Sequence, residues 1–422
     1  MRSQKPFPTA NMVFPIFLTL LLASIVVAAQ TQATKFNVLH TFHGADGGSP
    51  MGVLVRDAAG NIYGTTVGGG TGKCSKLGCG TAFKLNRSGQ QVWVHSFGGG
   101  DGYGPDAGLL RDAAGNLFGT TLDGGKVTKT CGGAQAGGCG VVFRLDRNGN
   151  ETVLYKFKGT PDGDSPEALL VEDKAGNLYG TTYEGGAEGL GAVLKIDTNG
   201  KEIILHSFAG PPDGGGDGAL SYQGVIRDAA GDLYGVTAGG GVYGAGVVYK
   251  VAGGKETLLY SFTGGSDGGG PNSVLLADVN GNLYGTTQNG GSSTVCDGGC
   301  GTVFRLSPDG GSWTETVLYS FCSVDGCVDG ERPIAGPLVR DSAGNLYGTT
   351  YFSGTNDDGV VFKLDASGKE TVLHSFTGGA DGEFPYAGLV RDSSGNLYGT
   401  TQAGGARCYT SYTCGVVFKI TP

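Results

Sequence analysis

The chain has 422 residues, of which 84 are glycine, and 16% of its residues are charged. Its formal net charge of -9 leaves no basic surface for the phosphates of a nucleic acid, so we expect no nucleic-acid partner. The glycines follow no Gly-X-Y period, which excludes a collagen-like fibre and assigns them to turns.

Residues 1–33 have the pattern of a cleaved secretory signal peptide. Arg2 and Lys5 form a basic end, and residues 12–27 form an apolar run followed by small residues. That run is shorter than the roughly 20 residues of a membrane-spanning helix, so an uncleaved anchor is the less favoured alternative. We expect no membrane span after signal removal, and a secreted, periplasmic or extracellular protein with one domain over 34–422.

One phrase, Gly-Asn-Leu-Tyr-Gly-Thr-Thr, recurs through the rest of the chain. It occurs four times unaltered and three times with one or two changes, beginning at Gly60, Gly115, Gly176, Gly231, Gly281, Gly344 and Gly395. Successive copies lie from 50 residues apart (231 to 281) to 63 apart (281 to 344). This spacing suits four strands with loops, as in a β-propeller blade.

Each repeat contains four runs typical of β-strands, as the sixth repeat shows. These runs cover residues 337–341, 345–350, 359–364 and 370–376. β-Branched and aromatic residues dominate them, and turn residues such as Gly, Asp and Ser separate them. Because no window of comparable length has apolar residues at helical spacing, the sequence predicts an all-β protein.

The two ends of the repeat region complete each other. Residues 36–42 correspond to a fourth strand without the three before it, and residues 415–420 to a third strand without a fourth. The first strand can therefore complete the last unit, which seals a ring and covers two open sheet edges. A parallel β-helix, the main alternative, gains nothing from this arrangement. We predict a seven-bladed β-propeller with four antiparallel strands per blade, closed by the strand at 36–42.

The phrase, together with the runs Gly-Val-Val-Phe-Lys-Leu and Glu-Thr-Val-Leu-His-Ser-Phe, resembles the Gloeo_Verruco (GloVer) tandem-repeat family of exported bacterial proteins. The resemblance covers residues 36–422. It implies export, a β-propeller-like repeat fold and, in many members, a C-terminal sorting or anchoring segment. The sequence shows no such segment before Pro422, which leaves surface anchoring open. The resemblance implies no catalytic residues.

The ten cysteines fall into five close pairs. These are Cys74 with Cys79, Cys131 with Cys139, Cys296 with Cys300, Cys322 with Cys327, and Cys408 with Cys414. An even number in local pairs on an exported chain predicts loop-closing disulfides in an oxidising compartment. Zinc binding is the alternative, but it would need four ligands from different repeats to converge.

Residue types that recur in every repeat are interpreted as scaffold, because every blade needs them. The last Phe of strand four and the aromatic residue of the phrase should fill the space between blades. The Asp before each phrase should cap its own turn. Four of the five histidines occupy one equivalent position on the outer strand, namely His40, His95, His206 and His374. We expect these four to be structural, whereas His43 has no equivalent in the repeat.

Loop lengths indicate which face binds a ligand. The turns between strands one and two and between strands three and four are mostly short and uniform. The loops from strand two to three and from four to one vary, and they carry all ten cysteines. In an up-and-down blade these two variable loops emerge on the same side, so we predict that this side is the binding face.

Each four-to-one loop also carries an Asp-Gly pair. The aspartates are Asp46, Asp101, Asp162, Asp217, Asp267, Asp329 and Asp381. We interpret the pair as a turn former. A ring of carboxylates that attracts a cation, a basic partner or a sugar is the alternative. Calcium would need several oxygens at each site, so we expect no cofactor and keep calcium as the alternative.

Departures from the repeat are the better candidates for ligand contact, because symmetry does not explain them. On the predicted face they are Tyr103, Asp106, Tyr183, Glu184, Tyr222, Glu331, Arg332, Asn356, Asp357, Asp358, Glu383, Phe384, Tyr386, Tyr409 and Tyr412. Aromatic residues among carboxylates suit carbohydrate stacking and hydroxyl recognition. They also suit a protein interface, where Tyr and Arg are common anchors.

The leading hypothesis is an exported, non-catalytic monomer that binds an extracellular glycan or protein through this face. The sequence contains no Ser-His-Asp set, metalloprotease helix motif or phosphate loop, so we expect no catalytic residue. A second hypothesis is a glycan hydrolase or lyase that uses two loop carboxylates such as Glu331 and Glu383. A third is a structural or adhesion repeat protein of the cell surface.

Overall fold

The computed structural model describes residues 1, 34–129, 131, 137–210, 216–334, 336–409 and 412–422, with the backbone alone at 409 and 412. The expected signal peptide, apart from Met1, lies outside the described residues. Residues Thr34–Pro422 form one compact unit. Within the described part of the chain, no helix is long and apolar enough to cross a membrane.

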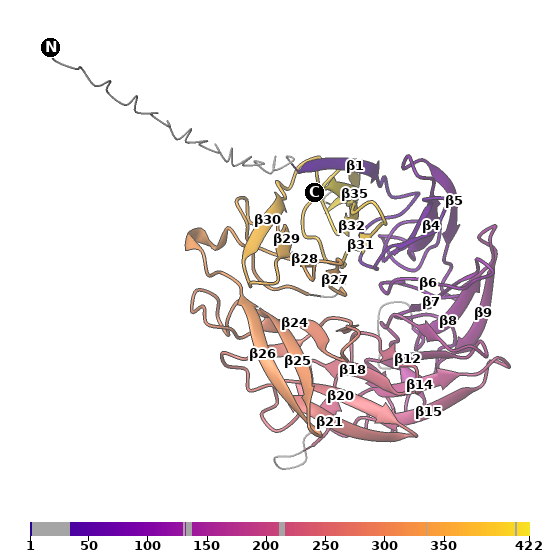
Figure 1. Cartoon of the computed structure of the whole chain (residues 1–422). Coiled ribbons are helices and arrows are strands. Elements are labelled where there is room, and N and C mark those ends of the chain that lie inside the picture. Colours follow the sequence, from indigo (N-terminus) through magenta and orange to yellow (C-terminus); the bar gives the residue numbers. More distant parts are fainter. Residues whose placement is uncertain (2–33, 130, 132–136, 211–215, 335, 410–411) are drawn as a thin grey trace. The chain divides into compact units, whose positions relative to one another are not determined.

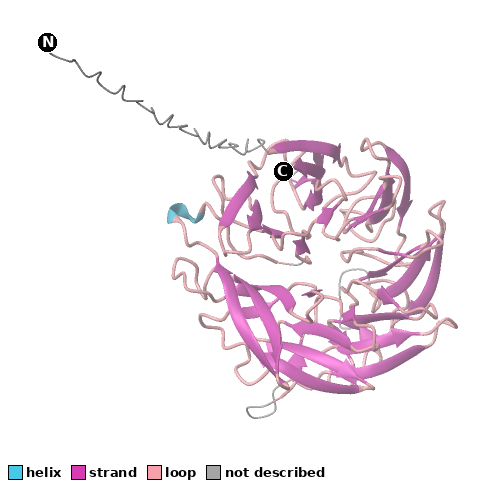
Figure 2. Cartoon of the chain, viewed as in Figure 1, coloured by secondary structure: helices cyan, strands magenta, loops and turns pink. Residues whose placement is uncertain are grey.

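Seven antiparallel sheets follow one another around a ring, as the labelled strands in Figure 1 show. In each sheet the first strand of the repeat lies nearest the axis and the fourth lies outermost. Six sheets have four strands, and one has a fifth, short strand. Strands and loops make up almost all of the unit (Figure 2). The prediction of a seven-bladed β-propeller is therefore confirmed.

The blades are numbered in chain order, and their strands are given from the axis outward. Blade 1 contains β2 (Val55–Arg56), β3 (Ile62–Thr66), β4 (Thr81–Leu85) and β5 (Gln91–Ser96). Blade 2 contains β6 (Leu110–Arg111), β7 (Leu117–Thr121), β8 (Val141–Leu145) and β9 (Glu151–Lys156). Blade 3 contains β11 (Val171–Glu172), β12 (Leu178–Thr182), β14 (Ala192–Ile196) and β15 (Glu202–Ser207).

The next three blades have the same order. Blade 4 contains β17 (Ile226–Arg227), β18 (Leu233–Thr237), β20 (Val247–Ala252) and β21 (Lys255–Ser261). Blade 5 contains β23 (Leu276–Ala277), β24 (Leu283–Asn289), β25 (Thr302–Asp309) and β26 (Ser312–Ser320). Blade 6 contains β27 (Val339–Arg340), β28 (Leu346–Thr350), β29 (Val360–Leu364) and β30 (Glu370–Ser375).

Short elements form in the loops between these strands. They are β10 (Gly163–Asp164), β13 (Glu184–Gly185), β16 (Gly218–Ala219), β19 (Gly239–Gly240), β22 (Gly269–Pro271), β33 (Arg407–Tyr409), β34 (Tyr412–Thr413) and the 3-10 turn η1 (Asp325–Cys327). β22 is the additional strand of blade 5, where it pairs with β24.

Blade 7 joins the two ends of the repeat region. It contains β31 (Val390–Arg391), β32 (Leu397–Thr401), β35 (Val416–Thr421) and, outermost, β1 (Lys35–Thr41). β1 and β35 pair in antiparallel register from Lys35 with Thr421 to Thr41 with Val416. The first strand of the chain therefore closes the ring, as predicted.

The first strand of each blade is shorter than the sequence indicated. In blade 6 only Val339–Arg340 pairs with β28, whereas the expected strand covered 337–341. The segments before these strands crowd together at the axis, where a Cβ atom on Gly336 would lie 1.8 Å from the backbone nitrogen of Gly388. We attribute the short pairing to this crowding.

Aromatic contacts join each blade to the next. The Phe that ends strand four is 0% exposed in all seven blades, at Phe42, Phe97, Phe157, Phe208, Phe262, Phe321 and Phe376. Phe262, for example, meets Phe304 of blade 5 edge to face, with ring centroids 5.1 Å apart. At the interface between blades 2 and 3, the residue that faces Phe157 is Leu194 instead of an aromatic ring. Phe157 and Leu194 pack in one buried cluster.

Side chains of the phrase stabilise the turn that precedes it. In blade 6, Tyr347 and the Asn345 side chain both donate hydrogen bonds to Asp341 Oδ2, at 3.0 and 2.7 Å. Burial raises the pKa of Asp341, but these hydrogen bonds outweigh it and hold the pKa below its ordinary value. The tyrosine bond recurs in all six blades whose phrase has a tyrosine.

The first threonine of the phrase ties one blade to the next. Thr65 Oγ1 donates to the carbonyl of Ala107 at 2.7 Å, and Thr181 Oγ1 donates to that of Gln223 at 2.9 Å. Equivalent bonds link blade 2 to blade 3 and blade 6 to blade 7. The recurrence of the phrase thus has a structural explanation.

Phe262→Ala should destabilise the propeller by roughly 3–5 kcal/mol, because it removes a buried ring and leaves a cavity between two blades. Val279→Ala, at a side chain that is 99% exposed, is the control and should change stability by less than about 0.5 kcal/mol. Denaturant unfolding followed by circular dichroism compares the two. Equal unfolding midpoints for both variants would contradict the role given to Phe262.

Candidate functional site

The two variable loops lie together at one end of the blades. Each four-to-one loop pairs with the two-to-three loop that follows it, as β10 does with β13 and β16 with β19. Single bridges join Tyr103 to Asp123 and Glu383 to Ala403 in the same way. Both kinds of loop therefore emerge on one face, which we call the loop face.

Six of the seven Asp-Gly aspartates, all except Asp101, are hydrogen-bonded to the outer strand of their own blade. Asp381 Oδ2 lies 3.0 Å from His374 Nε2, and Tyr155 donates to Asp162 Oδ2 at 2.9 Å. Equivalent bonds reach Asp46, Asp217, Asp267 and Asp329. Because the partners are the histidines and tyrosines of the outer strands, the interpretation as turn formers accounts for these carboxylates.

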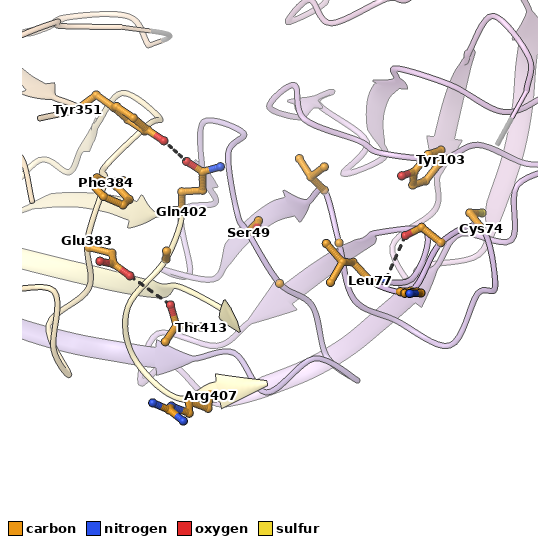
Figure 3. Close-up of a pocket in the computed structure, with 16 residues that line it drawn as sticks. Ser49, Cys74, Leu77, Tyr103, Tyr351, Glu383, Phe384, Gln402, Arg407 and Thr413 are labelled. Atoms are coloured by element: carbon orange, nitrogen blue, oxygen red, sulfur yellow. Dashed lines mark hydrogen bonds between the residues drawn. The ribbon is translucent and has the colours of Figure 1, made fainter. Parts of the chain in front are cut away.

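A pocket of about 930 Å³ opens on the loop face (Figure 3). Its walls come from loops of blades 1, 6 and 7 and from the loop between blades 1 and 2. The side chains that line it include Lys76, Tyr103, Tyr351, Glu383, Phe384, Gln402, Arg407 and Thr413. Its volume lies in the range of roughly 300–1,000 Å³ that is usual for small-ligand sites.

Two aromatic rings form a platform in this pocket. Tyr351 and Phe384 stack with centroids 5.2 Å apart and an interplanar angle of 27°. Tyr386 meets the edge of Tyr351 at 5.9 Å, so the aromatic surface continues from the pocket toward the axis. Both platform rings are half-buried, which leaves part of each in contact with solvent.

Polar groups surround the platform. Tyr351 donates its hydroxyl to Gln402 Oε1 at 2.6 Å, and Thr413 Oγ1 donates to Glu383 Oε1 at 3.2 Å, as the dashed lines in Figure 3 show. Burial and the Glu383 carboxylate raise the pKa of Tyr351, so its hydroxyl keeps its proton at neutral pH. Arg407 is exposed at the rim.

Phe384 holds an unfavourable backbone conformation. Its φ of 57° lies in the left-handed region, which bulky residues rarely adopt. The same position, third after the Asp of Asp-Gly, has a positive φ in the other six blades as well, where it is occupied by Ser49, Gly104, Ser165, Leu220, Gly270 and Arg332. The Phe384 amide donates to the carbonyl of Asp358 in the preceding blade at 3.0 Å, which fixes this geometry. The left-handed conformation is therefore a property of this loop position in the repeat, which Phe384 shares with Leu220 and Arg332.

The fifth position after the same Asp faces the axis. Its occupants are Met51, Asp106, Glu167, Tyr222, Asn272, Ile334 and Tyr386. Five of them, Met51, Asp106, Glu167, Tyr222 and Tyr386, line a small cavity of about 20 Å³ that also touches Val274 of blade 5. This cavity holds about one water molecule and is too small for a sugar ring.

The carboxyl groups at the axis are held near their neutral form. Burial raises the pKa of Glu167, and the carboxylates of Asp106, Asp123 and Glu184 raise it further. Burial and the nearby Asp123 likewise raise the pKa of Asp106. Glu167 is thus protonated at neutral pH and Asp106 is partly protonated, but both line a cavity that is too small for a sugar ring.

The other predicted candidates on the loop face fall into separate groups. Tyr183 and Tyr222 stack at 4.3 Å, and the Tyr222 hydroxyl donates to that of Tyr183 at 3.0 Å. Glu184 lies in β13, where burial and the carboxylate of Asp164 raise its pKa. These residues lie at blades 3 and 4, apart from the residues that line the pocket.

Glu331 and Glu383, the two loop carboxylates given as an example in the second hypothesis, lie in different places. Glu383 lines the pocket, whereas Glu331 Oε2 lies 2.8 Å from Cys296 Sγ in blade 5. Each glutamate sits in the loop of its own blade, and the pattern of the sequence does not show which loops meet. Arg332 lies over the ring of Phe352 at 5.8 Å.

The remaining candidates do not form one group on the loop face. Asp358 lies beside the pocket, where its carbonyl accepts the hydrogen bond from the Phe384 amide. Burial raises the pKa of Asp358, and the carboxylates of Glu383 and Asp357 raise it further. The Asn356 side chain donates to the carbonyl of Phe376 at 3.1 Å. The side chains of Tyr409 and Tyr412 lie outside the described residues.

The sequence interpretation missed several residues of the pocket and the axis. Tyr351 and Gln402 directly follow the Thr-Thr of the phrase, which is also the position of the selected Tyr183. Glu167 is equivalent in the repeat to Asp106. Comparison of equivalent loop positions would have found these three, whereas nothing in the repeat marks Arg407.

Disulfides brace the loops. All five expected pairs are joined, and no free cysteine occurs among the residues that the structure describes. Cys74–Cys79 closes the loop that carries Lys76, and Cys408–Cys414 closes the loop that carries Thr413. Disulfides of this kind indicate an oxidising compartment.

Buried carboxyl groups also lie between neighbouring blades. Burial raises the pKa of Glu315 to about 7, and Asp267 of the preceding loop raises it as well. The pKa of Glu370 is raised to about 7 by burial and by Asp329. The Oε1 atom of each glutamate is buried without a hydrogen bond. Both groups are therefore disfavoured as anions in the folded protein.

Comparison with known sequences places these features in a family. A model described as the Gloeobacter/Verrucomicrobia repeat matches residues 24–217, 127–296 and 294–422. Among curated proteins, none is significantly similar in sequence to this chain.

Solved structures share the fold. Virginiamycin B lyase from Staphylococcus aureus has a TM-score of 0.53 at 12% identity, over 92% of this chain and 99% of that chain. An ulvan lyase, a polysaccharide lyase in a saccharide-bound structure, has a TM-score of 0.51 at 13% identity, over 91% of this chain and 95% of that chain. At such identities the likeness concerns the fold alone.

Stability should change with pH through Glu315 and Glu370. In the unfolded chain both lose their protons near pH 4.5, whereas in the folded protein they keep them to about pH 7. Their ionisation therefore lowers stability as the pH rises between these values. A double variant with Glu315→Gln and Glu370→Gln has no ionisable group at these positions, so it does not lose this stability as the pH rises. Its melting temperature relative to wild type should be higher at pH 8 than at pH 5, and a difference independent of pH would contradict the assignment.

Proposed function

The chain belongs to the Gloeobacter/Verrucomicrobia repeat family, and we propose that it is an exported, non-catalytic binding propeller whose pocket on the loop face holds a glycan. The observation that carries this proposal is the stacked pair Tyr351 and Phe384 at 5.2 Å inside a pocket of about 930 Å³. Aromatic faces bind the apolar faces of sugar rings, and the surrounding polar groups recognise hydroxyls.

The polar lining supports a glycan over an apolar ligand. Gln402, Glu383 and Thr413 place amide, carboxylate and hydroxyl groups around the platform. Arg407 and Lys76 add positive charge at the wall, which favours a sugar that carries a carboxylate or sulfate. An ulvan lyase with the same fold was solved with a bound saccharide, which supports a glycan as the proposed ligand.

The position of Phe384 also supports a binding role. Its left-handed backbone conformation recurs at the equivalent position of the other blades, including Leu220 and Arg332, so the loop fixes the backbone while the side chain varies. Phe384 lines the pocket and stacks on Tyr351. Its side chain is therefore assigned to ligand contact.

A catalytic role is less well supported. The pair Glu331 and Glu383 required by a two-carboxylate mechanism does not assemble in the pocket. The protonated carboxyl of Glu167 suits a general acid, but Glu167 lines a cavity of about 20 Å³. Binding without turnover is the function that the geometry favours.

A glycan array that includes neutral, uronic-acid and sulfated oligosaccharides tests the proposal on the purified protein. Phe384→Gly should weaken binding of the best glycan by roughly tenfold or more, about 1.4 kcal/mol. Its melting temperature should stay close to wild type, because relief of strain offsets the lost stacking. Tyr243→Ala, at a side chain on the loop face that is 62% exposed, is the matched control and should bind normally.

Three outcomes would overturn the proposal. These are normal glycan binding by Phe384→Gly, no binding to any glycan of the array, and release of sugar products by the wild-type protein. A protein ligand that competes at Phe384 would replace the glycan while keeping the pocket as the binding site.

The disulfides beside the pocket should matter for affinity as well as for stability. Replacing Cys74 and Cys79 with serine should cost about 2 kcal/mol of stability, as a disulfide that closes a short loop does. It should also weaken glycan binding, because the loop with Lys76 and Leu77 loses its brace. Replacing Cys296 and Cys300 is the control, since it should cost similar stability and leave the affinity unchanged. Equal affinity loss in both variants would contradict this role.

A further inference from the structure

The strand-four histidine of blade 1 lacks the hydrogen bond that its counterparts make. The Nε2 atoms of His40, His206 and His374 lie 2.9, 2.7 and 3.0 Å from the aspartate of their own loop. His95 Nε2 lies 3.9 Å from Asp101 Oδ2. This nitrogen is buried and has no hydrogen-bond partner.

Glu151, the first residue of β9 in blade 2, faces the same nitrogen. Its Oε2 lies 3.5 Å from His95 Nε2, and its side chain is only 9% exposed. Its Oε1 is buried without a hydrogen bond. The ligand atoms of His95, Asp101 and Glu151 lie within 4.8 Å of one another. Two carboxyl groups and an imidazole nitrogen thus face one another at one point between the blades, where a cation could bind to all three.

We propose that His95, Asp101 and Glu151 form a zinc site that joins blades 1 and 2. Zinc binds His nitrogen and carboxylate oxygen at about 2.0–2.2 Å, which places two tetrahedral ligands about 3.3–3.5 Å apart. The separations of 3.5 and 3.9 Å need only small side-chain shifts to reach this value. An imidazole nitrogen with two carboxylates suits zinc and not calcium, which takes six to eight oxygen ligands.

The surroundings are consistent with a bound ion. Phe97 packs against the His95 ring edge to face at 4.8 Å and fixes its orientation. The side chain of Asp101 is 32% exposed, so an ion and a water as fourth ligand can enter from solvent. The nearby ammonium of Lys156 donates instead to the carbonyl of Gly100 at 2.6 Å.

Zinc at this position would have two effects on the fold. It would connect β5 to β9 across the interface between two blades. Because Asp101 lies two residues before Tyr103, the ion would also anchor the loop that forms one wall of the pocket.

Calorimetric titration of zinc chloride into the full-length protein, freed of metal with EDTA, tests the site. One zinc per chain should bind, and saturating zinc should raise the melting temperature by several degrees, because the ion binds only the folded state. His95→Gln and Asp101→Asn should each weaken binding at least tenfold. His206→Gln is the matched control, since His206, Asp217 and Glu256 form a similar cluster in which the histidine is already hydrogen-bonded. Calcium should produce no shift.

Circular dichroism checks whether each variant folds. If His95→Gln does not fold, the zinc affinity of Asp101→Asn decides the test. Zinc binding that survives the substitution in a folded variant would overturn the proposal. Loss of binding on replacing the exposed His43 with Gln would overturn it as well, because the ion would then be bound elsewhere. The absence of binding at micromolar zinc would have the same consequence.

Discussion

An aromatic contact between neighbouring blades is the interaction on which the ring depends. The Phe that ends each outer strand is fully buried, and in six of seven interfaces it meets an aromatic ring of the next blade edge to face. These contacts lie between strands, as do the threonine and tyrosine hydrogen bonds of the phrase. Because these contacts do not depend on the variable loops, the loops can differ from blade to blade, and those of blades 1, 6 and 7 help to form the pocket.

The repeat made the fold predictable and the pocket difficult to predict. The phrase with Tyr347 recurs because each blade needs it, and the unmatched strands at the two ends indicate closure directly. The pocket instead depends on which loops meet in space. Tyr351 and Arg407 come from different blades and share no pattern, so their convergence required the structure. The sequence likewise does not show that Glu331 and Glu383, the example carboxylates of the second hypothesis, lie in different places.

Residues that differ in their contacts from their equivalents in other blades indicate function where the repeat does not. His95 looks the same in sequence as His40, His206 and His374, and only the distance to its aspartate separates it from them. Likewise, Phe384 shares its left-handed backbone with Leu220 and Arg332, and it differs from them in that its ring stacks on Tyr351 in the pocket. In both cases the common scaffold fixes the backbone, so a local departure shows what one blade does and the others do not.

Closure by β1 also sets an order of events during synthesis. β1 leaves the ribosome first and its partner β35 leaves last, so at roughly 5–20 residues per second β1 waits on the order of 20–80 s for its pair. During that time it is an open strand edge of the kind that pairs with other chains. Lys35, Asn37 and His40 interrupt its apolar character and oppose such pairing. Until the last strand arrives, the nascent blades form an open arc.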